Sequence, residues 1–255
     1  MNLVIPIGSS SKFFSIEEYG YPKPLIELMG KPMIEHVIAN VTQGIHFSNI
    51  IFIVRQDECQ KFHLDNTLNL LSPIKPQIIQ LQSDTQGALC SILLAIEHID
   101  NDEPLMISNA DQIFDGGIAS YIDEFGKQEL DAACLSFHSV HPRWSYVRTN
   151  EQNHVIETAE KKPISKHAIA GLYLYKKGSD FVRYGMDSIK HGSSIDSKYF
   201  IAPVFNEFIL AGKKVGHYPV ENAKYHSFYS PQKIEEFEAT YARSGLHQVN
   251  RLGDK

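Results

Sequence analysis

Apolar runs and helical periodicities alternate through the first half of the chain. Short apolar runs typical of buried strands occupy 2–7, 49–55, 77–82 and 104–109. Amphipathic helical patterns fill the gaps at 32–42, 57–71 and 86–99. In the last of these, Leu89, Ile92, Leu93 and Ile96 recur at helical spacing, which predicts a face packed on a sheet. The alternation predicts parallel strands joined by helical crossovers.

The second half has a different pattern, in which strands follow one another closely. Strand patterns occupy 130–139, 144–149, 154–160, 168–176 and 214–220, and helical patterns occupy about 179–189, 203–212 and 232–243. Closely spaced strands predict an antiparallel or mixed extension. We therefore predict an α/β fold, with a Rossmann-like, mostly parallel mixed sheet flanked by helices and an antiparallel extension in the second half. Without a linker-like tract, one domain is expected over 1–255, with halves 1–128 and 129–243 and a tail at 244–255.

Composition and charge narrow the classes of function. The 255 residues are 43% hydrophobic and 21% charged, which predicts a sizeable core, and the net charge is -6. Because lysines and arginines are scattered singly, we expect no polymeric nucleic acid partner and no anionic membrane surface. Cys59, Cys90 and Cys134 are widely spaced, which indicates reduced thiols. The first apolar run is too short for a signal sequence or membrane span, so a cytoplasmic protein is expected.

Three polar segments follow strands of the predicted parallel sheet, where ligands of open α/β sheets bind. They are 8–12, 82–87 and 109–111. The first, a glycine followed by three serines and a lysine, fits either a phosphate-binding turn or a polar surface turn. Pro22 and Pro24 fix the backbone around Lys23, which suits phosphate binding, although this tripeptide alone is also typical of a surface turn.

Three spaced motifs change the balance between these interpretations. They are Gly8-Ser9-Ser10-Ser11-Lys12, Pro22-Lys23-Pro24-Leu25 and Gly30-Lys31-Pro32-Met33-Ile34. In this order they resemble the signature of sugar-1-phosphate nucleotidyltransferases, G-x-G-[ST]-R, PKPL and G-K-P-[ML]-I, with further matches from residue 2 to about 238. The resemblance implies that Gly8, Ser9, Ser10 and Ser11 wrap a triphosphate, that Lys12 holds the leaving pyrophosphate, and that Lys23 lies near the α-phosphate. Ser10 replaces the family's second glycine, and Lys12 replaces its arginine.

The same resemblance implies roles for residues farther along the chain. Gln82 stands where the family reads the edge of a pyrimidine, although it could also be an ordinary polar residue at the end of a strand. Gly87 stands where the family's backbone approaches the base, although it could also be only a helix cap. Asp111 matches the ligand of Mg²⁺, and a helix N-cap is its alternative. The resemblance also implies that Glu160, Lys161 and Gly171 bind the acceptor. Because Lys162 follows Lys161 directly, either lysine could point toward the acceptor.

Two further positions bear on the function. Ser227 stands where the family often has a second metal-binding aspartate, so the metal would depend on Asp111 and the nucleotide phosphates. Trp144, between Arg143 and Tyr146, could stack on a ligand or cage a quaternary amine, but packing within a strand is the favoured interpretation. These variations resemble the branch of the family found in capsule and surface-polysaccharide pathways.

The resemblance implies a nucleotidylyltransferase that transfers NMP from a pyrimidine nucleoside triphosphate to a phosphorylated small molecule and releases pyrophosphate. A sugar 1-phosphate is the first candidate for the acceptor, with Mg²⁺ as the cofactor. A CTP-dependent enzyme acting on phosphoglutamine or phosphocholine for capsule decoration is the first alternative. The second is a catalytically degenerate nucleotide-binding protein, suggested by Ser10, Lys12 and Ser227. The base, the acceptor and a homo-oligomeric state stay open.

Overall fold

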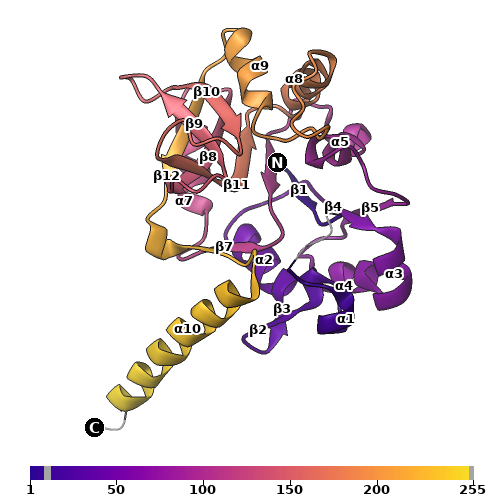
Figure 1. The fold of residues 1–255 in the computed structure, drawn as a ribbon, viewed down its shortest axis with the longest axis vertical. Helices are drawn as coiled ribbons and strands as arrows, with labels where there is room; N and C mark the ends of the chain where they lie inside the picture. The colour runs from indigo at the N-terminus through magenta and orange to yellow at the C-terminus, as the bar shows by residue number, and fades with distance from the viewer. Residues whose placement is uncertain (9–12, 253–255) are drawn as a thin grey trace.

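One mixed sheet forms the centre of the molecule (Figure 1). The computed structural model describes residues 1–8 and 13–252, with side chains as far as residue 242. In this part of the chain nine strands join in the order β10-β9-β11-β6-β1-β4-β5, with β8 paired to β11 and β12 to β8. Their bounds are β1 Asn2–Pro6, β4 Asn49–Arg55, β5 Gln77–Leu81, β6 Leu105–Ser108, β8 Ala132–His138, β9 Ser145–Thr149, β10 Val155–Glu160, β11 His167–Tyr175 and β12 Val215–Pro219.

The parallel and antiparallel parts of the sheet meet at β6 and β11. Strands β6, β1, β4 and β5 run parallel, with Val4 opposite Ile51 on one side and Ile107 on the other. β11 pairs antiparallel with β6, and β8, β9 and β10 continue the antiparallel pairing. This arrangement confirms the predicted mixed sheet with its extension in the second half.

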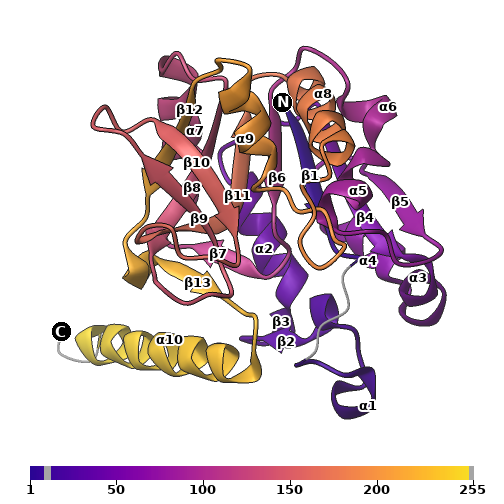
Figure 2. The same cartoon turned by 45° about the horizontal axis from the view of Figure 1, so that its top comes forward.

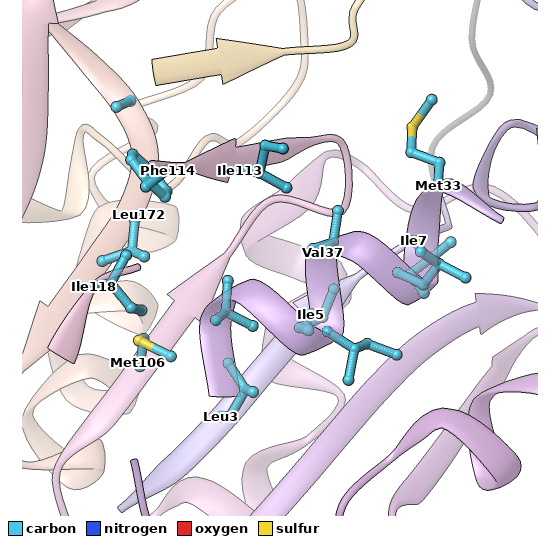
Figure 3. Close-up of a cluster of buried hydrophobic side chains, with 14 of the residues drawn as sticks. Leu3, Ile5, Ile7, Met33, Val37, Met106, Ile113, Phe114, Ile118 and Leu172 are labelled. Carbon is cyan, nitrogen blue, oxygen red and sulfur yellow. The ribbon is translucent and has the colours of Figure 1, made fainter. Parts of the chain in front are cut away.

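Helices cover both faces of the sheet, because successive strand residues point to opposite sides. One face packs against α2 (Met33–Thr42), α3 (Gln56–Phe62), α4 (Leu64–Leu71), α7 (Ala119–Lys127) and α10 (Pro231–Leu252). The other packs against α5 (Ala88–Leu93), α6 (Ile96–Ile99), α8 (Gly178–Lys190) and α9 (Val204–Leu210). Figure 3 shows the first core, where Leu3 and Ile5 of β1 lie beside Val37 of α2. The central strands are thus buried on both faces.

Several helices and strands differ from the sequence prediction. The helix expected over 57–71 divides at His63, whose φ of 53° is left-handed, and that over 86–99 divides between Leu93 and Ile96. The helix expected over 232–243 is longer in the structure, where α10 continues to Leu252 and projects from the sheet (Figures 1 and 2). Unpredicted elements are α7 and the short segments α1 (Ile16–Tyr19), η1 (Lys23–Leu25), β2 (Glu27–Leu28), β3 (Lys31–Pro32), β7 (Gln112–Phe114), η2 (Asn222–Lys224) and β13 (Tyr225–Ser227).

The small sheet of β7 and β13 affects the predicted site directly. The two strands pair antiparallel, with Ser227 opposite Gln112 and Tyr225 opposite Phe114. The pairing therefore brings residue 227 beside the segment that follows β6. None of the described helices is both long and apolar enough to cross a bilayer.

Candidate active site

Three pockets adjoin one another at the carboxyl ends of the parallel strands. The pocket that contains Lys23 and Asp111 has a volume of about 180 Å³, and it shares Pro6 and Asn109 with a pocket of about 290 Å³. A third pocket, of about 340 Å³, shares Lys23 with the first and Asp84 with the second. The segments after β1, β5 and β6 therefore border one composite cleft, at the sheet edge where the sequence predicted a ligand site.

Lys23 and Asp111 meet in the smallest of these pockets. Lys23 begins η1 directly after Pro22, and its ammonium group forms an ion pair with Asp111 Oδ2. The ammonium also lies 5.3 Å from the centre of the Phe14 ring. The two charged side chains are 18% and 26% exposed, so the pair is partly shielded from water yet open to the pocket. A rigid turn thus holds one cation against one carboxylate at a strand end.

Gly171 holds the segment that carries Asp111. Its carbonyl accepts hydrogen bonds from Asn109 N–H at 2.9 Å and from Gln112 Nε2 at 3.0 Å. A Cβ atom at position 171 would lie 2.2 Å from Asn109 Nδ2, and the φ of 63° also favours glycine. Gly171 is buried, and this close packing explains why glycine is needed at position 171. The predicted contact with the acceptor would be a second reason.

The neighbouring pocket contains Gly8, Gly87 and Lys198. Gly87 has a φ of 109°, and a Cβ atom there would lie 2.3 Å from the carbonyl oxygen of Tyr199. Tyr199 N–H donates to Gln86 O at 2.7 Å, so the chain around Tyr199 crosses closely over the start of α5. The structure therefore requires glycine at position 87 for packing, and the predicted approach of a base remains a prediction.

The segment that contains Gln82 is tied to the end of β4. Arg55 Nη1 donates to Asp84 Oδ1 at 2.5 Å, and Arg55 Nε donates to Asp57 Oδ1 at 3.1 Å. Gln82 itself is exposed directly after β5, and it is not among the described residues that line the three pockets. The structure thus places its loop beside the cleft without bringing the side chain into contact with it.

Glu58 is a second carboxyl group that borders the cleft. It lines the pocket of about 340 Å³ together with Lys23 and Arg55. The pKa of Glu58 is raised to about 7, mainly by burial and also by the charge of Asp57, while Arg55 acts in the opposite direction. Its Oε2 atom is buried without a hydrogen-bond partner in the described part of the chain. The cleft therefore contains a carboxyl group that titrates near neutral pH.

Glu160 and Lys161 lie at the end of β10, on the antiparallel side of the sheet. The Ser145 hydroxyl donates to Glu160 Oε2, and burial raises the pKa of Glu160. Lys161 has a φ of 55°, and its Nζ lies 3.6 Å from Asp196 Oδ2. No hydrogen bond or ion pair between described residues joins these two side chains to the Lys23–Asp111 pair. Lys161 instead reaches the chain segment that carries Lys198.

Comparison with known proteins identifies the family of this chain. A model of the nucleotidyl transferase family matches residues 7–214. The chain belongs to this family. The family that the sequence resemblance predicted is therefore confirmed.

Individual relatives show the same similarity. The bifunctional protein GlmU of Methanocaldococcus jannaschii is 27% identical over 159 residues, which cover 61% of this chain but 35% of that protein. The nucleoside-diphosphate-sugar pyrophosphorylase of Vibrio cholerae superposes with a TM-score of 0.79 at 22% identity, over 93% of this chain and 99% of that one. The inositol-1-phosphate CTP transferase of T. maritima gives 0.71 at 15% identity, over 91% and 90%. These two structures show a shared α/β fold.

Lys198 is a pocket residue that the sequence pattern did not indicate, as are Arg55 and Glu58. Lys198 lines the pocket of Gly8 and Gly87, where a tight turn with positive φ at Asp196 and Ser197 presents it. Ile195 and Lys198 bridge across that turn. Two consecutive left-handed residues favour Asn, Asp or Gly, and Asp196 is the single residue of that kind here. The sequence therefore offered only a weak signal for this turn.

The residues present fit a divalent cation at Asp111. Mg²⁺ takes hard oxygen ligands and usually binds one or two carboxylates together with substrate phosphates. Asp111 supplies one such carboxylate beside the cleft, and Ser227 lies opposite the next residue, Gln112. No cluster of three or more His, Cys, Asp or Glu side chains suited to a metal occurs in the described ranges. Ser9, Ser10, Ser11 and Lys12 lie outside the described residues, so their roles remain predictions.

Proposed function

We propose that this nucleotidyltransferase transfers NMP from a pyrimidine nucleoside triphosphate to a phosphorylated small molecule, with release of pyrophosphate. The observation that supports this most directly is the Lys23–Asp111 pair, which borders the cleft at the carboxyl ends of the parallel strands. A cation fixed by two prolines suits a phosphate, and a neighbouring carboxylate suits the metal that accompanies a triphosphate. Together they mark the place where the α-phosphate reacts.

The reaction needs charge neutralisation and positioning more than it needs proton transfer. An oxygen of the acceptor phosphate attacks the α-phosphorus in line, and the bond between the α-phosphorus and the bridging oxygen breaks as pyrophosphate leaves. Lys23 offsets negative charge at the α-phosphate, and Asp111 would hold Mg²⁺, which supplies further electrostatic stabilisation. The attacking phosphate is already ionised near neutral pH, so no general base is required.

The parts of the cleft suggest where each substrate lies. Gly8 and the residues that follow it would hold the triphosphate, and the base would lie toward Gln82 and Gly87. Lys198 adds a positive charge to the same pocket. Glu160 and Lys161 would bind the acceptor, and Lys161 reaches toward the Lys198 turn through Asp196.

A sugar 1-phosphate is the first candidate acceptor, and a CTP-dependent reaction with a non-sugar phosphate is the second. The relatives support either choice, because one is named as a nucleoside-diphosphate-sugar pyrophosphorylase and another as an inositol-1-phosphate CTP transferase.

Pyrophosphate release tests the proposal. Each of CTP, UTP, dTTP, ATP and GTP is incubated with each of a panel of sugar 1-phosphates, phosphocholine and phosphorylated amino acids, with Mg²⁺ present. Release that requires both a pyrimidine nucleotide and an acceptor would support the proposal. Nucleotide binding without release in any combination would favour the degenerate binding protein instead.

A further inference from the structure

A fourth pocket, which the proposed chemistry does not use, opens between the end of β8, the β8–β9 loop, β13 and α10. Its volume is about 580 Å³, larger than each of the three cleft pockets. Five Phe, Tyr or Trp side chains line it, from Phe137, Trp144, Tyr225, Tyr229 and Phe237. We call it the Trp144 pocket. Figure 2 shows β13 between β9 and α10 on this side of the molecule.

The aromatic walls of the Trp144 pocket are held by edge-to-face contacts. The Trp144 ring lies at 89° to Phe137 and at 81° to Tyr229, with centroids 5.2 and 5.8 Å apart. The Phe137 ring also packs against Tyr225, with the two ring centroids 4.6 Å apart. Backbone hydrogen bonds order the loop, since Trp144 N–H donates to His141 O at 3.3 Å. The pocket is thus pre-formed, which limits the entropic cost of binding a ligand there.

Its charges favour an anion over a cation. The Arg143 guanidinium stacks 3.8 Å from the centre of the Tyr229 ring, and no carboxylate in the described part of the chain forms an ion pair with it. Lys233 is neutralised by Glu236 within the pocket. Because Arg143 already occupies the Tyr229 face, a quaternary amine would meet a positive charge in place of an open aromatic cage. The N–H edge of a stacked guanidinium remains free to donate two parallel hydrogen bonds to a carboxylate.

Two connections join the Trp144 pocket to the residues of the proposed reaction. On one wall, Ser227 lines the pocket and the next residue, Phe228, donates its N–H to Asp111 O at 2.8 Å. On the other wall, Trp144 O accepts the N–H of Lys161 at 3.1 Å. The hydroxyl of Ser145, beside Trp144, also contacts Glu160. The walls of the pocket therefore adjoin the segments that carry Asp111, Glu160 and Lys161.

We propose that the acceptor carries a carboxylate group at the end distant from its phosphate, and that Arg143 binds this carboxylate in the Trp144 pocket. The inference rests on the proposed transfer to a phosphorylated small molecule, and it names a chemical class of acceptor. Phosphorylated amino acids and uronic acid 1-phosphates belong to this class. Phosphocholine does not, so the inference disfavours that alternative.

Matched acceptor pairs test the inference. O-phosphoserine differs from phosphoethanolamine by a carboxylate, and glucuronic acid 1-phosphate has a carboxylate where glucose 1-phosphate has a hydroxymethyl group. For each compound we would measure kcat/KM from pyrophosphate release, and Kd by calorimetry with Mg²⁺ and a non-hydrolysable CTP analogue. In at least one pair, the compound with the carboxylate should have a lower Kd and a higher kcat/KM than its neutral partner. Arg143→Ala should lower its kcat/KM by roughly 10- to 150-fold, the range for a lost charge-assisted hydrogen bond, and should change that of its neutral partner by no more than about twofold.

Arg148→Ala provides the matched control, because Arg148 is an exposed arginine of β9 that pairs with Glu157 away from the pocket. It should leave both members of each pair unchanged. The inference would be overturned if the two members of each pair had equal kcat/KM and equal Kd. It would also be overturned if Arg143→Ala lowered the kcat/KM of both members by the same factor. If no acceptor releases pyrophosphate, the proposed function fails, and the calorimetric comparison of the pairs in wild type and Arg143→Ala still decides whether the pocket selects a carboxylate.

Discussion

The Lys23 ammonium forms an ion pair with the Asp111 carboxylate, although the two residues are 88 positions apart in the chain. Each side chain neutralises the charge that the other would carry alone in a partly shielded pocket. A nucleoside triphosphate with a divalent cation would offer new partners to both groups, phosphate to Lys23 and metal to Asp111. We therefore expect the ion pair to persist while substrate is absent and to separate when the nucleotide and the metal bind.

Removal of either partner should stop turnover while leaving the fold intact. Asp111→Ala is expected to retain less than about a tenth of wild-type kcat, equivalent to at least ~1.4 kcal/mol of barrier. Lys23→Ala should lose kcat/KM by a similar factor or more, because a charge-assisted contact to the α-phosphate contributes about 1.5–3 kcal/mol. Steady-state kinetics measure both effects, and thermal unfolding reports whether the fold is retained.

Two variants outside the cleft serve as controls for these losses. Asp102→Ala removes an exposed carboxylate that pairs with Lys177, and Lys31→Ala removes an exposed lysine that pairs with Glu35. Both should keep wild-type kinetics. Substantial turnover in Asp111→Ala would show that this carboxylate does not hold the metal.

Gln82 should set the preference for a pyrimidine base. Its amide can donate to a carbonyl oxygen of a pyrimidine, and it can accept from the ring N–H of uracil or thymine or from the amino group of cytosine. Gln82→Ala should therefore narrow the ratio of kcat/KM between the best pyrimidine nucleotide and ATP or GTP. At saturating nucleotide, the rate should change less than this ratio. A wild-type enzyme that uses ATP or GTP as well as any pyrimidine nucleotide would refute this role.

Gly87→Ala should disturb the cleft by displacing the chain around Tyr199. The added Cβ would lie 2.3 Å from Tyr199 O, and the φ of 109° is rarely adopted by other residues. We expect the free energy of unfolding to fall by about 2 kcal/mol or more and the nucleotide KM to rise. Gly212→Ala is the control, because Gly212 also has a positive φ, 73°, but no atom lies within 4 Å of its added Cβ. Equal destabilisation by the two substitutions would show that the contact with Tyr199 is not the cause.

Glu58 should make stability depend on pH between about 4.5 and 7. Its pKa rises from 4.5 to about 7 in the folded state because of burial, so the folded chain holds this proton more tightly than the unfolded chain does. The stability contribution is present below the unfolded pKa and is lost as the pH rises through the folded pKa. Glu58→Gln should therefore resemble wild type near pH 5 and be more stable than wild type at pH 8.

Urea unfolding at both pH values measures this difference. Glu17→Gln, which replaces an exposed carboxyl group of the same pocket, is the matched control and should give no such change. If the difference in stability between Glu58→Gln and wild type were the same at both pH values, the raised pKa of Glu58 would be contradicted.

The sequence alone determined the central sheet and most of its strands, because hydrophobic periodicity is a local property of the chain. The runs at 2–7 and 49–55 became β1 and β4, and the helical pattern at 32–42 became α2. The motifs around Lys23 and Asp111 likewise indicated the family and the edge of the sheet where its ligands bind. The break at His63 was not predictable in this way, since a left-handed residue other than glycine leaves little signal in composition.

Only the tertiary structure decided which distant side chains meet. The Lys23–Asp111 contact, the packing of Gly87 under Tyr199 and the entry of Lys198 into the cleft depend on the path of segments far apart in sequence. The Trp144 pocket exists because α10 and β13 return beside the β8–β9 loop. Hydrophobic pattern specifies which face of an element is buried, whereas the contacts at a site depend on how loops cross one another after those faces have packed.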